Sequence, residues 1–372
     1  MTNPDSIPVR LPTADRTHYP ALDGLRGIAI ILVILYHNFN FIEYFNYGWL
    51  GVDLFFVLSG FLITNILLNS LTSENYFKNF YARRVLRIFP LYYFSLILFL
   101  FIIPAINPSL LQMSYYKEHQ LWFWTYLQNW PLIIKSDESG IALNHYWSLA
   151  IEEQYYLLWP LIILVLKKPK RILILCILIL TIVIAARFYI WENSDHYPAY
   201  ERAFLFTRVD GILIGSMLAA VYKINAHLLR KYFTFFLITL TAVNYLFYLY
   251  KKNQSPDFPV WAIAGFTTFS LIFAIAVYEA VMKDNRIINF FLTNPVLRFL
   301  GKYSYGFYIF HWPVFLLLKP YTDKFITGIT SKDELVYMIL SSLLATLAGL
   351  LVSIASYHLF EKHFLRLKRK FN

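Results

Sequence analysis

Long runs of apolar residues alternate with short polar segments along the whole chain. Helical runs long enough to cross about 30 Å of hydrocarbon occur at residues 24–42, 50–69, 89–107, 148–166, 172–191, 203–222, 232–250, 260–282, 296–318 and 335–360. A further aromatic stretch, 119–134, is shorter. The pattern predicts an all-α fold, a polytopic transmembrane helix bundle of about ten spans.

The composition agrees with this reading. The 372 residues are 58% hydrophobic and 15% charged, which is more apolar surface than a soluble core could bury. The first twenty or so residues are polar and broken by prolines, so we expect no cleavable signal peptide. We therefore predict a tail at 1–22, one membrane domain at 23–362 and a basic tail at 363–372.

The distribution of charge predicts the orientation. With the N-terminus inside and 119–134 not crossing, most of the 33 basic residues fall on the cytoplasmic side, as the positive-inside rule requires. Both termini are then cytoplasmic, and 119–134 is re-entrant or interfacial. The net charge of +11 is explained by the anionic inner leaflet and requires no nucleic acid.

Two polar residues interrupt the first apolar run. Arg26 and His37 lie where a purely lipid-facing helix would carry neither, which by default indicates a functional site. Eleven residues of helix turn through about 1100°, so both side chains point the same way, about 16 Å apart. One face of this helix is thus expected to carry a cation and, deeper, a base.

A second cationic feature precedes the third run. Arg84 and Arg87 are three residues apart and share a helical face at the cytoplasmic surface. Two guanidiniums on one face suit a phosphate ligand. The alternative is that these arginines merely follow the positive-inside rule.

Further ionisable residues lie near the non-cytoplasmic ends of three runs. Each could be a polar group satisfied between packed helices, and Arg208 with Asp210 could form a structural pair. Their common depth with His37 favours a shared site. These residues are Asp53, Glu152, Glu153, Arg208 and Asp210.

A second histidine lies in the ninth run. Ser304, Tyr308 and His311 fall roughly on one helical face. No spacing typical of metal ligands accompanies the histidines, and the single cysteine excludes a Cys-rich site, so we expect no metal. His145, like the other remaining histidines, is expected to be solvated or interfacial.

Together, several ordered stretches resemble the acyltransferase-3 family of bacterial integral membrane acyltransferases over essentially the whole chain. Any one stretch is a weak signal, whereas the ordered set is specific. The stretches are residues 22–26 with His37 following, 51–61, 84–90, 147–160, 208–211, 304–311 and 360–362.

The resemblance implies a multi-pass enzyme of the bacterial cytoplasmic membrane. Such an enzyme transfers an acyl group, most often acetyl, from acyl-CoA to a hydroxyl of a glycan or glycolipid, such as a cell-surface polysaccharide or its lipid-linked precursor. Acyl-CoA would be the donor substrate, with no permanently bound cofactor. Glycan acceptor and membrane lipids are the expected partners. Many relatives add a soluble hydrolase-like domain after the membrane domain.

This resemblance gives the polar residues roles. Arg26, Arg84 and Arg87 would anchor the CoA phosphates, and His37 would act as general base or be acylated itself. Glu152 or Asp53 would fix its tautomer. A proton-coupled transporter is the alternative function, because it could use the same residues as a relay, although matched inverted repeats are not evident. Candidate substrate-binding residues are Glu153, Arg208, Asp210, Tyr308 and His311.

Overall fold

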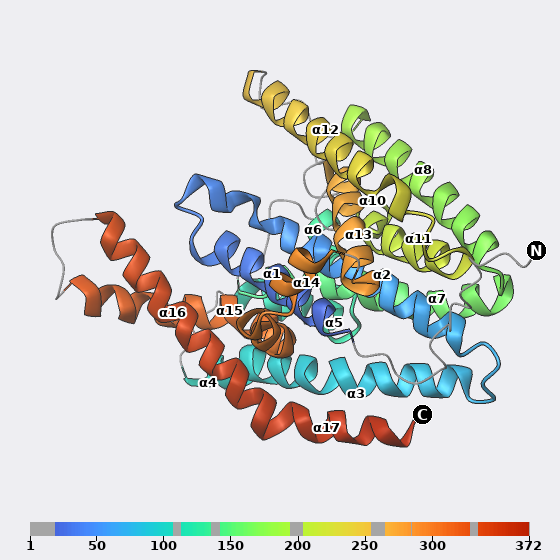
Figure 1. Ribbon diagram of the computed structural model, residues 1–372. Coiled ribbons are helices and arrows are strands. Elements are labelled where there is room, and N and C mark those ends of the chain that lie inside the picture. Colours follow the sequence, from blue (N-terminus) through green and yellow to red (C-terminus); the bar gives the residue numbers. More distant parts are fainter. Residues whose placement is uncertain are drawn as a thin grey trace, which may run out of the picture.

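The computed structural model describes residues 19–106, 113–134, 142–193, 204–253, 265–283, 285–327 and 334–371. Every regular element in these ranges is helical, so the prediction of an all-α fold is confirmed. Figure 1 shows the helices as a bundle in which α3 and α17 lie together along one side and α8 and α12 along the opposite side.

The helices follow one another with short connections. In the first half they are α1 (Pro20–Asn38), η1 (Glu43–Trp49), α2 (Leu50–Asn69), α3 (Tyr76–Ile97), the π-helical η2 (Leu98–Ile102), α4 (Ile103–Ile106), α5 (Met113–Trp124), α6 (Pro131–Ile134), η3 (Asn144–Tyr146), α7 (Trp147–Leu166) and α8 (Pro169–Asn193). In the second half they are α10 (Leu205–Arg208), α11 (Asp210–Ile224), η4 (Arg230–Tyr232), α12 (Phe233–Asn253), α13 (Phe266–Met282), α14 (Arg286–Leu292), α15 (Pro295–Thr327), α16 (Glu334–Ser356), η6 (Tyr357–Glu361), α17 (Lys362–Leu367) and η7 (Lys368–Lys370).

Six helical segments of the described chain are long and apolar enough to cross a membrane, judged by length and composition. A seventh is reached if α13 and α14, which meet at a bend of 96°, count as one span. These segments correspond to seven of the apolar runs. The protein is therefore a multi-pass membrane protein, and the expected count of ten stays a prediction.

The three other expected spans differ from uniform apolar helices. The run 203–222 breaks at Val209 into α10 and the 15-residue α11. The 33-residue α15 covers 296–318 and carries charged residues toward both ends. The run 232–250 is α12, which contains a shorter apolar stretch, Thr234–Leu246. Within 119–134, the end of α5 and the short α6 are joined by turns, and neither meets the length of a span.

Helix α1 lies at the centre of the bundle, packed against α2 and α15. Glycines allow a very close approach between α1 and α15: a Cβ added at Gly27 would lie 2.1 Å from the carbonyl oxygen of Leu297, and one at Gly301 would lie 1.9 Å from that of Asp23. No side chain fits at either contact. The position of α1, and of the polar residues that it carries, is therefore fixed against α15.

Hydroxyl groups join α2, α7 and α11 in the interior. The hydroxyl of Thr64 donates to Ser216 Oγ at 2.8 Å and accepts from Trp159 Nε1 at 2.8 Å, while Tyr155 lies 2.7 Å from the same serine. Buried polar groups satisfied in this way hold neighbouring helices in register.

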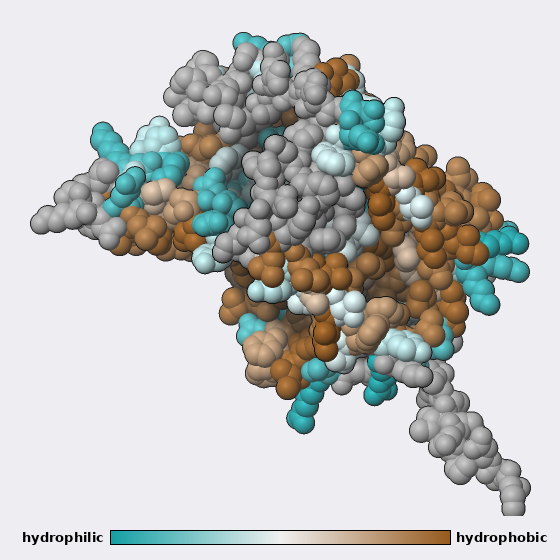
Figure 2. Space-filling view, turned by 90° about the horizontal axis from the view of Figure 1, so that it is seen from above, coloured by the Kyte–Doolittle hydropathy of each residue, from teal (hydrophilic) through white to brown (hydrophobic). Residues whose placement is uncertain are grey.

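The outer surface is largely apolar. Figure 2 shows brown apolar side chains covering much of one face, with teal polar side chains gathered at its margins. Exposed apolar residues recur along the outward faces of α7 and α8, as expected of surfaces that meet lipid. Examples are Leu157, Leu161, Val165, Ile174, Leu178 and Ile182.

Candidate active site

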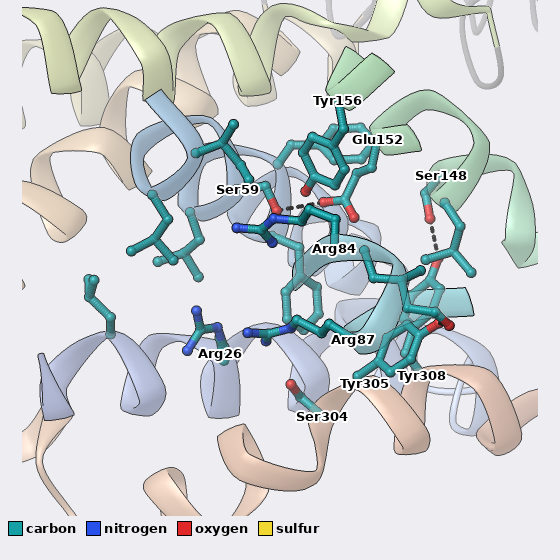
Figure 3. A pocket seen from close by; sticks show the side chains of 18 of the residues that line it. Arg26, Ser59, Arg84, Arg87, Ser148, Glu152, Tyr156, Ser304, Tyr305 and Tyr308 are labelled. Carbon is teal, nitrogen blue, oxygen red and sulfur yellow. Dashed lines mark hydrogen bonds between the residues drawn. The ribbon is translucent and has the colours of Figure 1, made fainter. Parts of the chain in front are cut away.

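A cavity of about 360 Å³ lies between α1, α2, α3, α7 and α15. Its walls combine apolar side chains such as Phe55 and Leu62 with a group of charged and hydroxyl-bearing residues. Figure 3 shows the side chains of Arg26, Arg84 and Arg87 gathered in this space. Residues far apart in the sequence thus converge on one cavity.

The arginines make this part of the cavity strongly cationic. Arg26 pairs with Asp23 at 2.6 Å, and the guanidinium of Arg84 lies 5.4 Å from the ring centroid of Tyr156. Arg26, Arg84 and Arg87 are close enough to repel one another, and Lys368 of η7 adds to this repulsion. In the described part of the chain no carboxylate is within ion-pair distance of Arg84 or Arg87. Such an arrangement favours an anionic ligand.

Two consecutive carboxylates of α7 line the same cavity. Glu152 accepts a hydrogen bond of 2.7 Å from Ser59 Oγ of α2. Glu153 Oε1 is buried without a hydrogen-bond partner among the described residues. The structure therefore places both glutamates beside the arginines and gives Glu152 a hydroxyl partner rather than an imidazole.

At its inner end the cavity is bounded by Ser148 and Tyr308. Their hydroxyl oxygens lie 2.6 Å apart, and the Tyr308 hydroxyl also donates to the backbone carbonyl of His145 at 2.8 Å (Figure 3). The ring of Tyr308 lies 5.3 Å from that of His145 and 5.8 Å from that of His311. Tyr308 thus separates the cavity from a group of histidines.

That group, which we call the histidine cluster, consists of His37, His145 and His311. The ring centroid of His311 lies 4.9 Å from that of His37 and 4.8 Å from that of His145, and His37 and His145 are 6.1 Å apart. His311 and His145 are buried, with 0% and 3% of their surfaces exposed. Helices α1 and α15 and the turn η3 supply the three rings.

The hydrogen bonds of His37 determine its tautomer. Nδ1 lies 2.9 Å from the carbonyl oxygen of Val33. A carbonyl can only accept, so Nδ1 carries the proton of the neutral ring and Nε2 carries the lone pair. This tautomer suits a general base. The backbone of α1 itself, in place of the carboxylate expected from the sequence, fixes it.

His145 is a site residue that the sequence reasoning missed. It was expected to be solvated or interfacial, and the structure buries it beside His311 instead. In the sequence it lies in a polar turn outside any apolar run. The available signal was its position directly before 147–160, the stretch that supplies Ser148 and Glu152.

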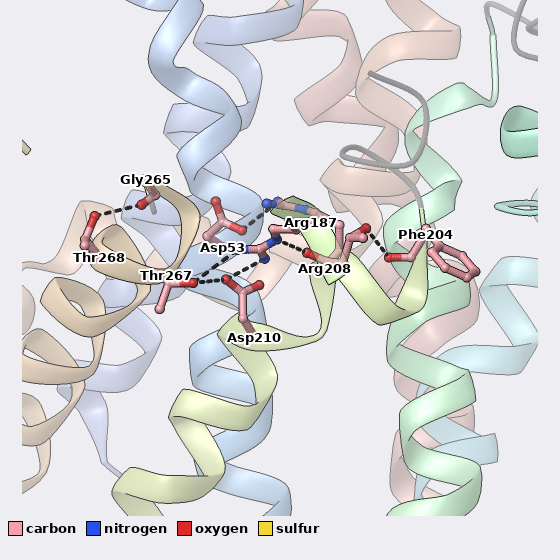
Figure 4. A network of polar contacts seen from close by, with 9 residues as sticks. Asp53, Arg187, Phe204, Arg208, Asp210, Gly265, Thr267 and Thr268 are labelled. Atoms are coloured by element: carbon pink, nitrogen blue, oxygen red, sulfur yellow. Dashed lines mark hydrogen bonds and ion pairs between the residues drawn. The ribbon is translucent and has the colours of Figure 1, made fainter. Parts of the chain in front are cut away.

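Asp53, Arg208 and Asp210 belong to a separate charge network (Figure 4). Arg208 pairs with Asp53 at 2.7 Å and Arg187 with Asp210 at 2.7 Å. The interpretation that Arg208 and Asp210 neutralise each other is therefore wrong, since each pairs with another helix. The guanidinium of Arg208 also lies 3.8 Å from the ring centroid of Phe266.

The network links helices rather than lining the cavity. Arg187 of α8 donates to the carbonyl of Thr207 at 2.6 Å, and Thr267 of α13 donates to Asp210 at 2.9 Å. The ion pairs, with side-chain exposures of 3% or less, join α2 to α10 and α8 to α11. Buried and paired in this way, the four charges hold the helices in place. Arg187 was not among the predicted site residues.

A multi-pass membrane protein with a cationic cavity beside buried histidines is the class that these observations define. The profile of the acyltransferase-3 family, described as an acyltransferase domain, matches residues 19–358. The chain belongs to this family.

Curated relatives agree with this assignment. The chain is 31% identical over 327 residues to the peptidoglycan O-acetyltransferase OatA of Listeria monocytogenes (strain EGD-e), an alignment that covers 82% of this chain and 50% of the relative. It is 30% identical over 325 residues to the O-acetyltransferase OatA of Staphylococcus aureus (strain NCTC 8325), covering 82% of this chain and 52% of the relative. The chain thus spans about half the length of these relatives. No solved structure matches it.

Proposed function

We propose that this protein is an O-acetyltransferase of a bacterial cytoplasmic membrane, which moves an acetyl group from acetyl-CoA to a hydroxyl of a cell-wall glycan. The observation that carries the proposal is a cavity with three arginines on its wall and a histidine cluster directly beyond its inner end. The names of the relatives, which include a peptidoglycan O-acetyltransferase, support a glycan acceptor. Family membership also favours transfer over the alternative of proton-coupled transport.

The arginines would bind the donor. CoA carries several phosphates, and guanidiniums bind phosphate through charge-assisted hydrogen bonds. Arg84 and Arg87 project from adjacent turns of α3, with Arg26 facing them from α1. In the ten-span topology this is the cytoplasmic side, where CoA is found. CoA would therefore stay at the inner face while its thioester arm enters the cavity.

The arm would end near Tyr308 and Ser148. Arg26 and His37 lie on one continuous helix, about 16 Å apart along its axis. An extended pantetheine arm is of similar length. The thioester would therefore reach the inner end of the cavity, where the ring of Tyr308 separates it from the histidine cluster.

The neutral ring of His37 would then act as the general base. As the acceptor oxygen attacks the thioester carbon, His37 Nε2 takes the hydroxyl proton. The new C–O bond forms, the C–S bond breaks, and the departing thiolate takes the proton from His37, which leaves an acetyl ester and CoA thiol. In a second version of the reaction His37 is acetylated first.

The carboxylates would act at a distance from this proton transfer. Glu152, held by Ser59, and its neighbour Glu153 face the donor cavity, where they would orient the arginines and the thioester arm. Asp53, Arg208 and Asp210 would position helices α2, α10 and α11 around the site through their ion pairs.

The test uses purified protein, acetyl-CoA with a labelled acetyl group, and a soluble chito-oligosaccharide as the acceptor. We expect label in the oligosaccharide as an alkali-labile ester, with one equivalent of CoA thiol released. The matched control is the Arg84→Ala, Arg87→Ala double variant, which should require far more donor. Absence of both CoA binding and acetyl transfer in the folded wild-type protein would refute the proposal.

A further inference from the structure

The histidine cluster contains buried nitrogen atoms whose hydrogen-bonding capacity is not used within the protein. His311 Nδ1 lies 2.8 Å from the carbonyl oxygen of Tyr308, so it carries the proton and Nε2 carries the lone pair. That Nε2 is buried and has no partner among the described residues. Both ring nitrogens of His145 are likewise buried without a partner in the described part of the chain.

These unpaired nitrogens are costly, because a buried polar atom without a hydrogen bond loses its interaction with water and gains nothing in return. The carbonyls of Tyr308 and Ile309 lie near the ring of His145 without reaching hydrogen-bond geometry. Unused buried groups of this kind gather where a ligand is bound.

The chemistry of the rings indicates which ligand. Each neutral imidazole has one lone pair, so the cluster presents three acceptors of hydrogen bonds: His37 Nε2, His311 Nε2 and one nitrogen of His145. The other nitrogen of His145 can donate. A hydroxyl group matches this set, because it donates one hydrogen bond and accepts up to two. None of the described groups of His, Cys, Asp and Glu is arranged to hold a metal ion.

We propose that His145 and His311 form the acceptor subsite, in which they hold the sugar hydroxyl that His37 deprotonates. The proposal rests on the proposed function and assigns the acceptor a place distinct from the donor cavity, on the opposite side of the Tyr308 ring. His145 donates its N–H to the hydroxyl oxygen, and His311 Nε2 accepts from a neighbouring hydroxyl of the same sugar. Both are therefore substrate-binding residues, while His37 remains the base.

Tyr308 connects the two sites. Its ring contacts both histidines, and its hydroxyl bridges Ser148 and the backbone carbonyl of His145. The backbone of His145 is thus fixed by a residue that also lines the donor cavity. This arrangement brings the acceptor hydroxyl and the thioester to opposite edges of one aromatic ring.

The test compares His145→Leu with His145→Gln. Leucine fills the space without a polar atom, and glutamine keeps one donor and one acceptor. Losing a hydrogen bond to a neutral hydroxyl raises the KM for the acceptor about three- to tenfold, so we expect that increase in His145→Leu and a smaller one in His145→Gln. The KM for acetyl-CoA and the binding of CoA alone should not change.

Thermal unfolding separates this role from a structural one. If His145 serves the acceptor, leucine removes two unpaired buried nitrogens, and the Tm of the protein should stay the same or rise. The matched control is His119→Leu, since His119 is also buried but lies on α5 and lines neither the cavity nor the cluster. His119→Leu should leave the KM for the acceptor unchanged.

Two results would overturn the acceptor subsite. One is a wild-type KM for the chito-oligosaccharide in His145→Leu. The other is a lower Tm together with equal losses for donor and acceptor, which indicates a structural histidine. A wild-type protein that binds CoA but transfers nothing would instead count against the proposed function, because the comparison of KM values presupposes transfer.

Discussion

At the scale of single residues, His37 owes its proposed reactivity to one backbone contact. The Val33 carbonyl holds the proton on Nδ1 and leaves Nε2 as the base. Because a carbonyl one turn earlier in the same helix makes this contact, the tautomer depends on α1 alone and not on a carboxylate from another helix.

Replacing His37 with alanine should abolish acetyl transfer and leave CoA binding largely intact, because the ring lies beyond the cavity that holds the donor. Removing a general base typically lowers the rate by about 10²- to 10⁴-fold. Rates are to be compared in matched amounts of folded protein, with His119→Ala as the control. Activity within a fewfold of wild type would remove His37 from the mechanism.

The arginine pair on α3 gives a different signature. Arg84→Ala or Arg87→Ala should raise the KM for acetyl-CoA with kcat nearly unchanged, because a phosphate contact far from the reacting atoms binds ground and transition states alike. Each lost charge-assisted hydrogen bond costs about 1.5–3 kcal/mol, which is roughly tenfold to over a hundredfold in affinity.

Arg87→Lys is the informative companion, because lysine keeps the charge and loses the planar fork. It should restore expression in the membrane but only part of the donor affinity. Complete recovery of the KM for acetyl-CoA by Arg87→Lys would show that the charge is sufficient and that the fork has no role.

Residue patterns predicted only part of this site. Arg26, Arg84, Arg87 and Glu152 could be selected because charge is rare in apolar runs, and the structure brings all four to one cavity. The pairing of Asp53 with Arg208 and the burial of His145 could not be predicted, because both depend on contacts between helices that are distant in sequence. Polarity indicates that a group needs a partner, but it does not indicate which one.

At the scale of elements, the contact between α1 and α15 is the most constrained. A methyl group at Gly27 would lie 2.1 Å from the carbonyl oxygen of Leu297, so the helices would have to separate. We expect Gly27→Ala to destabilise the protein by about 1–3 kcal/mol, as overpacking does, and to lower activity by moving Arg26 and His37. Thermal unfolding of the purified protein measures the first effect.

Gly349→Ala on α16 is the matched control. The nearest atoms to a Cβ there lie at 3.5 Å or more, which is ordinary contact, so its Tm should stay close to that of the wild type. An equal loss of Tm in both variants would indicate a general intolerance of alanine for glycine rather than a close helix contact.

The apolar runs predicted most helices but not where helices break. The run 203–222 divides at Val209 because Arg208 and Asp210 turn to different partners, Asp53 and Arg187. The 96° bend between α13 and α14 also follows a run that reads as one continuous segment. Hydropathy measures solubility in lipid, and these breaks result from specific polar contacts.

At the scale of the whole molecule, orientation can be measured with single cysteines. Cys176 is fully buried, so the native protein should react little with an impermeant thiol reagent. We expect Tyr44→Cys, at a position that is 80% exposed in η1, to be labelled in intact cells, because the ten-span topology places it outside.

Lys168→Cys supplies the opposite case. Lys168 is exposed between α7 and α8, and it should be labelled only after the membrane is opened. Lys135, which the same topology places outside, lies outside the described residues. Labelling of position 168 in intact cells would contradict the topology and make 119–134 a span.

The continuity of α1 also limits how this protein can vary. Each residue inserted into a helix turns everything beyond it by about 100° and advances it by about 1.5 Å. One extra residue between Arg26 and His37 would therefore direct the imidazole away from His311 while leaving every side chain in place chemically. Among natural relatives of this chain, the eleven-residue interval should accordingly keep its length even where most of its side chains differ, whereas connections such as that between α7 and α8 are free to lengthen.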